Sequence, residues 1–195
     1  YGMYALTTFA DYPFWIPDRK VDFEKEDISM GWNLLSYKKK ISSSSYLEGY
    51  EPELANDEQV ETWWAAQTGN AGEWLQIDLG KTMEVNAIQV NFDEYGANQK
   101  GAVSGVYQSY LIYASVNGED WSLVVDYGTK KTDTPHDYIE FEEPFKARYI
   151  KLQNKEYMVS ENFSVRDLRI FGKGQGSTPR AVNDFTVERD EADPC

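Results

Sequence analysis

The sequence has a single cysteine, Cys195 at its last position, so the chain can form no disulfide with itself. It is therefore not one of the small secreted domains that disulfides hold together. Histidine is equally scarce, because His136 is the only one, and this leaves no His and Cys set for a zinc site. Long apolar runs are missing too, since no stretch approaches the roughly 20 apolar residues of a membrane-spanning helix.

Positive charge is also in short supply, because 19 Lys and Arg stand against 33 Asp and Glu and give a net charge of −14. Such a surface repels nucleic-acid phosphates and anionic lipid headgroups, so we expect neither nucleic acid nor membrane insertion. The acidity suits a neutral sugar and a cation site, and it suits plain solubility equally well. Aromatic residues, by contrast, reach 15%, a level that suits both an all-β core and a sugar-stacking surface.

Alternating apolar and polar residues predict a series of short β-strands, and Asn117-Gly118 is a strong hairpin signal between two of them. Strand spacing near ten residues, with turn residues between, predicts an antiparallel sandwich or barrel. Helical candidates are limited to short pieces around residues 21–29 and 53–64. The expected strands cover residues 74–79, 85–92, 110–115, 121–125, 136–141, 148–153 and 165–171.

Composition divides the chain into three parts. Residues 1–40 are aromatic and irregular, and we interpret them as a connector or the tail of a preceding domain. Residues 41–173 carry the strand pattern. Residues 174–195 continue a Gly-rich linker and resemble the start of a following fibronectin type III-like domain.

The turn at residues 54–62 is the most informative polar segment. Calcium takes six to eight oxygen ligands, and a turn rich in Asn, Asp, Glu and Gln can direct several carbonyls inward. Asp57 supplies a carboxylate, and Thr62 can supply both its hydroxyl and its carbonyl. The alternative is that Asp57 caps a helix, with Glu61 behind it.

Six motifs in order resemble the coagulation-factor type C, or discoidin, domain, whose bacterial relatives include the family 32 carbohydrate-binding modules. The resemblance implies an eight-stranded, jelly-roll-like, galactose-binding-domain-like β-sandwich, often with one structural calcium. It also implies that Trp64 is a core residue. The motifs are Ala55-Asn-Asp57, Thr62-Trp-Trp64, Glu73-Trp-Leu-Gln-Ile-Asp-Leu-Gly80, Tyr110-Leu-Ile-Tyr-Ala-Ser-Val-Asn-Gly-Glu-Asp-Trp121, Ala147-Arg-Tyr-Ile-Lys-Leu152 and Ser164-Val-Arg-Asp-Leu-Arg-Ile-Phe-Gly172.

The family's calcium ligands fall on two segments of this sequence. The last of them is usually Glu, and Asp167 is one methylene shorter. A metal that joins these two segments would fasten the first turn to the last strand and stabilise the fold. By resemblance the ligands are the carbonyl of Leu54, the carboxylate of Asp57, a donor at Gln59, the hydroxyl and carbonyl of Thr62, the carbonyl of Arg166 and the carboxylate of Asp167.

A sugar site needs an exposed aromatic face and several hydrogen-bonding groups, which the family places on loops at one end of the sandwich. Each candidate has a structural alternative: Tyr95 and Tyr107 could anchor the long loop between them, and His136 could hydrogen-bond a turn. The predicted carbohydrate-binding residues are Trp63, Tyr95, Asn98, Tyr107, His136, Tyr157 and Asn162.

No catalytic constellation emerges, because no motif singles out a glycosidase acid pair or an activated nucleophile. The flanks, among them residues 9–18 and 31–38, resemble the C-terminal region of gut-bacterial family 43 glycoside hydrolases. This resemblance implies a secreted xylosidase or arabinofuranosidase whose catalytic domain is not in this sequence. We expect a monomeric, non-catalytic module that binds plant or host glycan and contacts the hydrolase's neighbouring domains, outside the cell, in the periplasm or on the surface of a bacterium. The alternative is a structural or interaction module without sugar binding.

Overall fold

The computed structural model describes residues 32–93 and 106–173. Within these ranges the chain is almost entirely β-structure, and every strand pairing is antiparallel, as the sequence predicted. None of the described residues forms a helix long and apolar enough to cross a membrane. The elements are β1 (Asn33–Leu34), β2 (Lys40–Ser43), the 3₁₀ turn η2 (Pro52–Ala55), β3 (Trp64–Ala65), β4 (Trp74–Phe92), β5 (Gln108–Ser115), β6 (Ser122–Tyr127), β7 (His136–Tyr157) and β8 (Ser164–Lys173).

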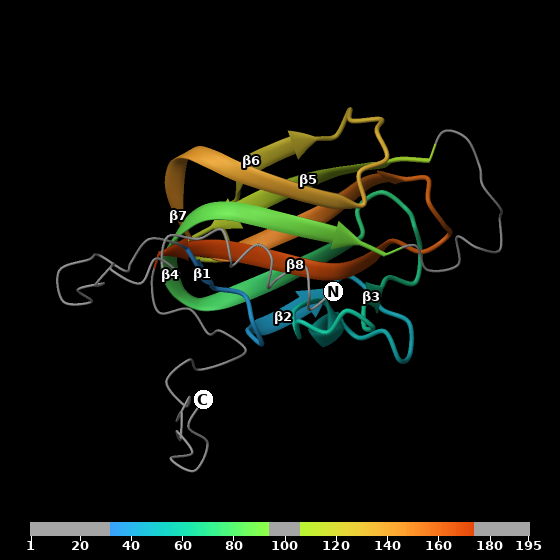
Figure 1. Cartoon of the computed structure of the whole chain (residues 1–195), viewed down its shortest axis with the longest axis horizontal. Coiled ribbons are helices and arrows are strands. Elements are labelled where there is room, and N and C mark those ends of the chain that lie inside the picture. The colour runs from blue at the N-terminus through green and yellow to red at the C-terminus, as the bar shows by residue number, and fades with distance from the viewer. Residues whose placement is uncertain (1–31, 94–105, 174–195) are drawn as a thin grey trace, which may run out of the picture. The chain divides into compact units, whose positions relative to one another are not determined.

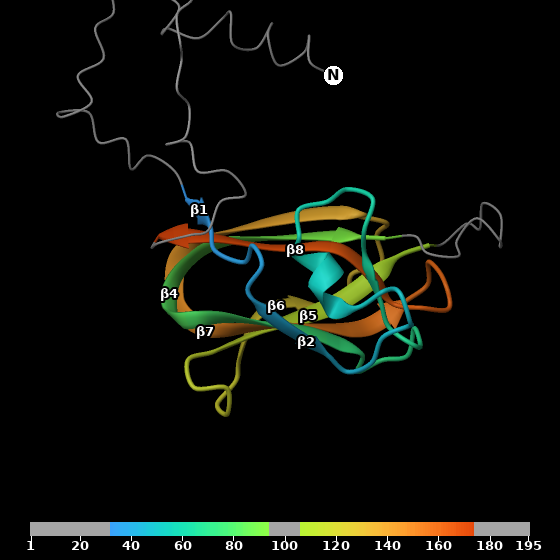
Figure 2. The same ribbon diagram turned by 90° about the horizontal axis from the view of Figure 1, so that it is seen from below.

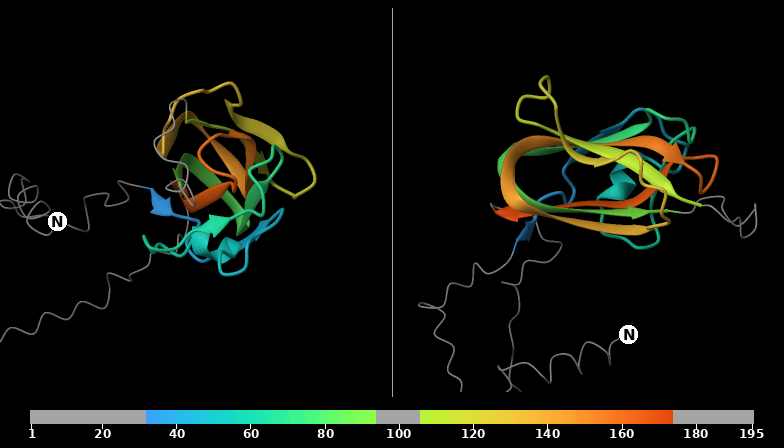
Figure 3. Two further views of the ribbon diagram at one scale, coloured as in Figure 1. Left: turned by 90° about the vertical axis from the view of Figure 1, so that its right-hand side faces the viewer. Right: turned by 90° about the horizontal axis from the view of Figure 1, so that it is seen from above.

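The strands form two packed layers, which Figures 2 and 3 show from two directions. The first layer joins β2, the first half of β4, the second half of β7, β5 and β6. The second layer joins β1 and β3 with β8, the second half of β4 and the first half of β7. Two long strands therefore take part in both layers, and Figure 1 shows β4 and β7 running side by side.

The sequence predicted β4 as two strands, 74–79 and 85–92, that are separated at Gly80, and it predicted β7 as two strands as well. The structure joins each pair into one continuous strand. The pairing of β4 with β7 is interrupted by an irregularity between Asp78 and Met83 and then resumes, so neither strand ends there. Gly80 has φ +84°, a backbone conformation that favours glycine, and its N–H donates to Asp78 Oδ1 at 2.8 Å. The glycine therefore bends the strand between layers and does not end it.

The core lies between the layers. Trp64, Tyr110 and Phe163 are its largest fully buried side chains, and the Trp64 ring meets the Phe163 ring edge-on at 5.6 Å. The core position that the resemblance gave to Trp64 is thus confirmed. On β8, Gly172 is required by close approach, since a Cβ there would lie 1.9 Å from the backbone oxygen of Glu84.

Three expectations change at the edges. The predicted helical piece at 53–64 is only the 3₁₀ turn Pro52–Ala55, and the piece at 21–29 lies outside the described residues. The sandwich also begins before residue 41, because β1 pairs with β8 inside the segment interpreted as connector. The hairpin at Asn117-Gly118 is confirmed, since β5 and β6 pair and Gly118 has φ +84°.

Candidate functional site

A hollow of about 640 Å³ lies between the end of β2 and η2. Tyr46 stands at it with 49% of its surface exposed, so a ring face is available to a ligand. Hydroxyl, carboxylate and amide groups surround the ring, and these are the groups that hydrogen-bond sugar hydroxyls. The lining residues are Ser43, Ser44, Ser45, Tyr46, Glu48, Glu51 and Gln67.

The hollow is held in shape by Glu73, which comes directly before β4. Its carboxylate accepts hydrogen bonds from the Ser44 hydroxyl, from Ser45 Oγ at 2.8 Å and from Thr68 Oγ1 at 2.7 Å. Burial by itself raises the pKa of Glu73, but the hydrogen bonds from Ser44, Thr68 and Ser45 outweigh it and leave the pKa below its ordinary value of 4.5. Glu73 is therefore charged at neutral pH and fastens two loops together.

Replacing Glu73 with Gln tests this role. The carboxylate's folded pKa lies below its unfolded pKa, so its stabilisation is present above about pH 4.5 and is lost as pH falls through the lowered value. We expect the variant to have a lower melting temperature at neutral pH and a shallower loss of stability on acidification. Thermal unfolding across this pH range measures both. Glu84→Gln is the control, because Glu84 makes only a 3.5 Å ion pair with Lys173; an equal effect there would contradict the role.

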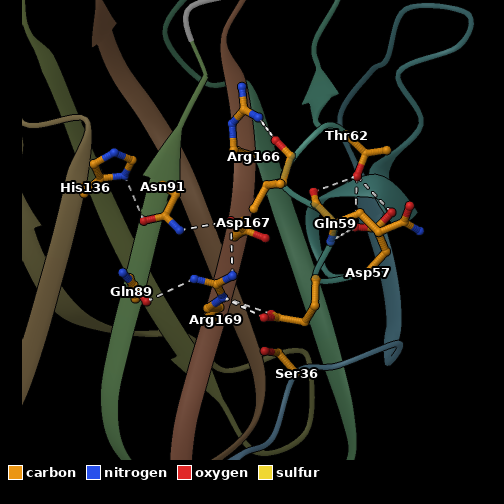
Figure 4. A network of polar contacts seen from close by, with 12 residues as sticks. Ser36, Asp57, Gln59, Thr62, Gln89, Asn91, His136, Arg166, Asp167 and Arg169 are labelled. Carbon is orange, nitrogen blue, oxygen red and sulfur yellow. Dashed lines mark hydrogen bonds and ion pairs between the residues drawn. The ribbon is translucent and has the colours of Figure 1, made fainter. Parts of the chain in front are cut away.

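The predicted metal residues lie on two facing elements, the loop at residues 54–62 and β8, as Figure 4 shows. On the loop, the Asp57 carboxylate accepts from the Thr62 hydroxyl at 2.9 Å and from the Gln59 N–H at 2.9 Å. The Gln59 carbonyl accepts from the same Thr62 hydroxyl at 3.0 Å. The loop thus gathers oxygen atoms around one turn, and no helix follows Asp57 for it to cap.

On β8, Asp167 is 2% exposed, and its Oδ1 is buried without a hydrogen-bond donor among the described residues. The other oxygen accepts from Asn91 Nδ2 at 3.0 Å and lies 3.5 Å from the Arg169 guanidinium. A buried carboxylate oxygen without a partner is costly, so this atom suits a cation ligand. The shorter Asp in the place of Glu therefore still directs a free oxygen into the protein.

The loop is fastened to β8 by side chains. Glu58, at φ +61°, receives Arg169 Nε at 2.9 Å and 3.0 Å on its two oxygens. Arg166 donates to the Val60 carbonyl and pairs with Asp93. The described residues contain no group of three or more His, Cys, Asp or Glu side chains suited to a metal. A cation here would consequently need two carboxylates together with hydroxyl and carbonyl oxygens, which is the donor set that calcium accepts.

The predicted sugar residues do not gather at one place. Trp63 is half-buried. The centroid of its ring lies 5.2 Å from that of Tyr50 and 5.5 Å from the Arg166 guanidinium. Tyr157 was predicted as a ligand contact, but it is 6% exposed, and its hydroxyl donates to the Asp93 carbonyl, so it is a core residue. Tyr95 and Asn98 lie outside the described residues.

The other three candidates have structural partners. Tyr107 donates to Glu156 Oε2 at 2.8 Å, which raises its pKa. His136 is exposed, and its Nδ1 hydrogen-bonds Asn91 Oδ1 at 3.2 Å. Asn91 in turn donates to Asp167, so His136 belongs to the polar network drawn in Figure 4. Asn162 Nδ2 donates to the Ala66 and Gln67 carbonyls at 3.0 Å each and so supports the edge of the hollow.

Sequence reasoning missed the hollow itself. A signal was present, because four consecutive serines, residues 42–45, form the end of β2 and the residues between it and Tyr46. The contribution of Glu73 was not visible, since its partners Ser44 and Thr68 come together only when the two loops fold side by side.

Known proteins resemble this chain both in sequence and in fold. Lactadherin from Mus musculus is 30% identical over 142 residues, which are 65% of this chain and 29% of that protein. A chitosan-binding module 2 from a Paenibacillus sp. IK-5 chitosanase/glucanase, in complex with chitotriose, superimposes with a TM-score of 0.60 at 22% identity, over 71% of this chain and 99% of the module. The family 32 module of C. perfringens NanJ, in complex with galactose, gives a TM-score of 0.58 at 20% identity, over 73% and 99%.

The curated relatives are longer than the part they share with this chain, which spans less than a third of the lactadherins from rat, mouse and cow. The model of the F5/8 type C domain matches residues 40–168, more than half of the 195 residues. These residues include β2 to β7 and the first half of β8, and they carry the Asp57 and Asp167 segments. The chain therefore belongs to the F5/8 type C domain family.

Proposed function

We propose that this domain is a non-catalytic carbohydrate-binding module that takes a sugar in the hollow beside Tyr46. The observation that carries the proposal is one exposed aromatic ring surrounded by hydroxyl, carboxylate and amide groups. The Tyr46 ring offers a flat face for sugar C–H groups. Glu48, Glu51 and Gln67 offer hydrogen-bonding groups for the hydroxyls.

The neighbours in structure support a sugar ligand. Modules of the same fold are held in complex with chitotriose and with galactose, and the first derives from a chitosanase/glucanase. We extend this to a parent glycoside hydrolase of the secreted, bacterial, xylosidase or arabinofuranosidase kind, in which this domain holds the enzyme on plant or host glycan. The alternative is a structural or interaction module of the same hydrolase, in which the hollow binds no sugar.

We also propose a structural calcium between the loop and β8. Asp57 and Asp167 would supply the two carboxylates, and Thr62 and Gln59 would supply further oxygens with the carbonyls of Leu54 and Arg166. Bound there, calcium would neutralise the buried Asp167 oxygen and join the first turn to the last strand. The support is the donorless Oδ1 of Asp167. The ion would stabilise the fold and would not touch the sugar.

Tyr46→Ala tests the sugar site. We expect the affinity for a bound sugar to fall about tenfold, since an aromatic contact is worth up to ~1.5 kcal/mol beyond the area it buries. Calorimetry against galactose, chitotriose, xylotriose and arabinotriose measures the affinity. Tyr138→Ala is the matched control, because Tyr138 is similarly exposed, at 53%, but lies on the second layer.

Two results would count against the proposal. One is an unchanged affinity in Tyr46→Ala, which would place the sugar elsewhere. The other is the absence of binding across a wide panel of neutral glycans, which would favour the structural module.

A further inference from the structure

The outer face of the first layer carries a second group of aromatic and polar side chains. Gln76 of β4 lies directly opposite Lys151 of β7, which in turn lies opposite Tyr113 of β5. In the next row, Trp74 lies opposite Gln153. All are half-buried, while the alternate residues of these strands point into the core. We call this surface the β7 platform, and it consists of Trp74, Gln76, Tyr113, Trp121, Lys151 and Gln153.

The centre of the platform is the ammonium group of Lys151. It lies 3.8 Å from the ring centroid of Trp121 and 5.7 Å from that of Trp74, so two indole rings flank it. Within residues 32–93 and 106–173, no carboxylate or other oxygen pairs with it. Its neighbour Arg148, by contrast, makes two hydrogen bonds to Asp78, at 2.7 Å and 2.9 Å.

Burial lowers the pKa of Lys151, since the rings remove water from the ammonium and put no negative charge beside it. An ammonium has three N–H donors, and the faces of two rings satisfy them only weakly. An anionic ligand group that approached the Lys151 ammonium would supply both the missing acceptor and the missing charge.

The two amides beside Lys151 add hydrogen-bonding capacity. The side chains of Gln76 and Gln153 make no hydrogen bond to the described part of the chain. Each offers one acceptor and two N–H donors in a plane, which suits vicinal sugar hydroxyls. The indole rings of Trp74 and Trp121 stand next to them and provide apolar surface. The platform thus presents groups that fit a sugar ring, its hydroxyls and a carboxylate together.

We propose that the β7 platform binds a glycan chain that contains uronic acid, with the sugar carboxylate on Lys151 and sugar rings against Trp74 and Trp121. The inference rests on the proposed function for its ligand class, but it uses other residues. The two surfaces meet, because the backbone N–H of Trp74 donates to Ser44 Oγ at 2.9 Å and Ser44 lines the hollow. The hollow contains carboxylates that repel an acidic sugar, so the acidic unit belongs on the platform.

The net charge of −14 does not prevent an acidic glycan from binding to the platform. The Debye length is about 8 Å at physiological ionic strength, so charges near the platform dominate the local potential. Lys40 lies opposite Asp78 in the sheet and Arg148 pairs with the same Asp78, so the carboxylate two residues from Gln76 on β4 is offset by two positive charges. Affinity for an acidic chain is therefore expected to fall as salt rises.

The test compares each acidic oligosaccharide with its methyl ester, which has the same rings without the charge. Calorimetry uses trigalacturonate, trimannuronate and a glucuronic-acid-substituted xylan fragment, each in both forms. We expect at least one acid to bind and its ester to bind about tenfold more weakly, because hydrogen bonds to charged groups exceed neutral ones in strength.

Lys151→Gln is expected to reduce acid binding by about the same tenfold and to leave ester binding unchanged. Lys155→Gln is the control, since it removes an exposed lysine of the same strand. Trp121→Ala should weaken both forms. Circular dichroism checks that each variant is folded. Equal binding of acid and ester, an unaffected Lys151→Gln variant, or no binding of any acid would overturn the inference.

The two proposals fail separately. Acid binding that depends on Lys151, with no neutral sugar bound, would leave the platform and remove the hollow as a site. Neutral-sugar binding that depends on Tyr46, with no acid bound, would do the reverse.

Discussion

Trp64→Ala is expected to lower the free energy of unfolding by about 3–5 kcal/mol, the usual cost of truncating a buried tryptophan. Trp64 is fully buried between the layers, its ring meets Phe163 edge-on, and its indole N–H donates to the Ser45 carbonyl at 3.0 Å. The variant therefore leaves a cavity and removes one of two hydrogen bonds to the Ser45 carbonyl, which keeps the bond from the Ser43 hydroxyl at 2.9 Å. Urea unfolding followed by circular dichroism measures the change.

The structure offers a matched control in Trp121→Ala. Trp121 is half-buried at the surface, where truncation removes contacts without a cavity, so its cost should be much smaller. The Ser45 carbonyl belongs to the edge of the hollow, and we expect Trp64→Ala to weaken sugar binding as well. A loss of stability no greater than that of Trp121→Ala would contradict the core assignment.

Removal of the proposed calcium is the second change with a large expected effect. A ligand present at 100 times its Kd stabilises the folded state by ~2.7 kcal/mol, so excess chelator should lower the free energy of unfolding by about that amount. The physical reason is the buried Asp167 carboxylate: without the ion its Oδ1 would have no partner among the described residues, while its other oxygen keeps Asn91 and the Arg169 guanidinium. The melting temperature, measured with calcium and with chelator, is expected to differ by several degrees, while the affinity for sugar changes less.

Variants locate the effect. Asp57→Asn and Asp167→Asn should remove the response to calcium, while Asp120→Asn, in the hairpin turn, should keep it. In chelator, Asp167→Asn should lower the free energy of unfolding only a little. The amide replaces a buried carboxylate whose Oδ1 has no hydrogen-bond partner among the described residues. A melting temperature that is the same with calcium and with chelator would mean that the Arg169 pairs with Glu58 and Asp167 suffice.

The fold could be predicted from the sequence largely because its strands alternate. Ile77, Ile150 and Leu152 follow the period of two and lie in the core, and the hairpin at Asn117-Gly118 forms where that signal predicts it. Gly80 was misleading, because a glycine that ends a strand and one that bends it look alike in the sequence. The bend appears only with the second layer, to which the rest of β4 belongs.

The site was less predictable because its residues are joined by loops that the sequence does not pair. The motifs placed Asp57 and Asp167 on facing elements, but the ion pair of Glu58 with Arg169 across them was not foreseen. Tyr157 looked like an exposed loop residue, whereas β7 continues to it and directs it inward. The hollow could not be predicted from the sequence, because its shape depends on contacts between residues about thirty positions apart, such as Ser44 and Glu73.

The pairing of β1 with β8 has a mechanical consequence. The two strands are antiparallel neighbours, with Asn33 opposite Gly172, so the chain enters and leaves the sandwich at adjacent points. Tension applied through the chain would peel β1 from β8 one hydrogen bond after another. Such an unzipping geometry yields at low force, because the bonds break in succession. A glycan held on the first layer would thus be anchored to strands other than the β1 and β8 pair that takes the load first.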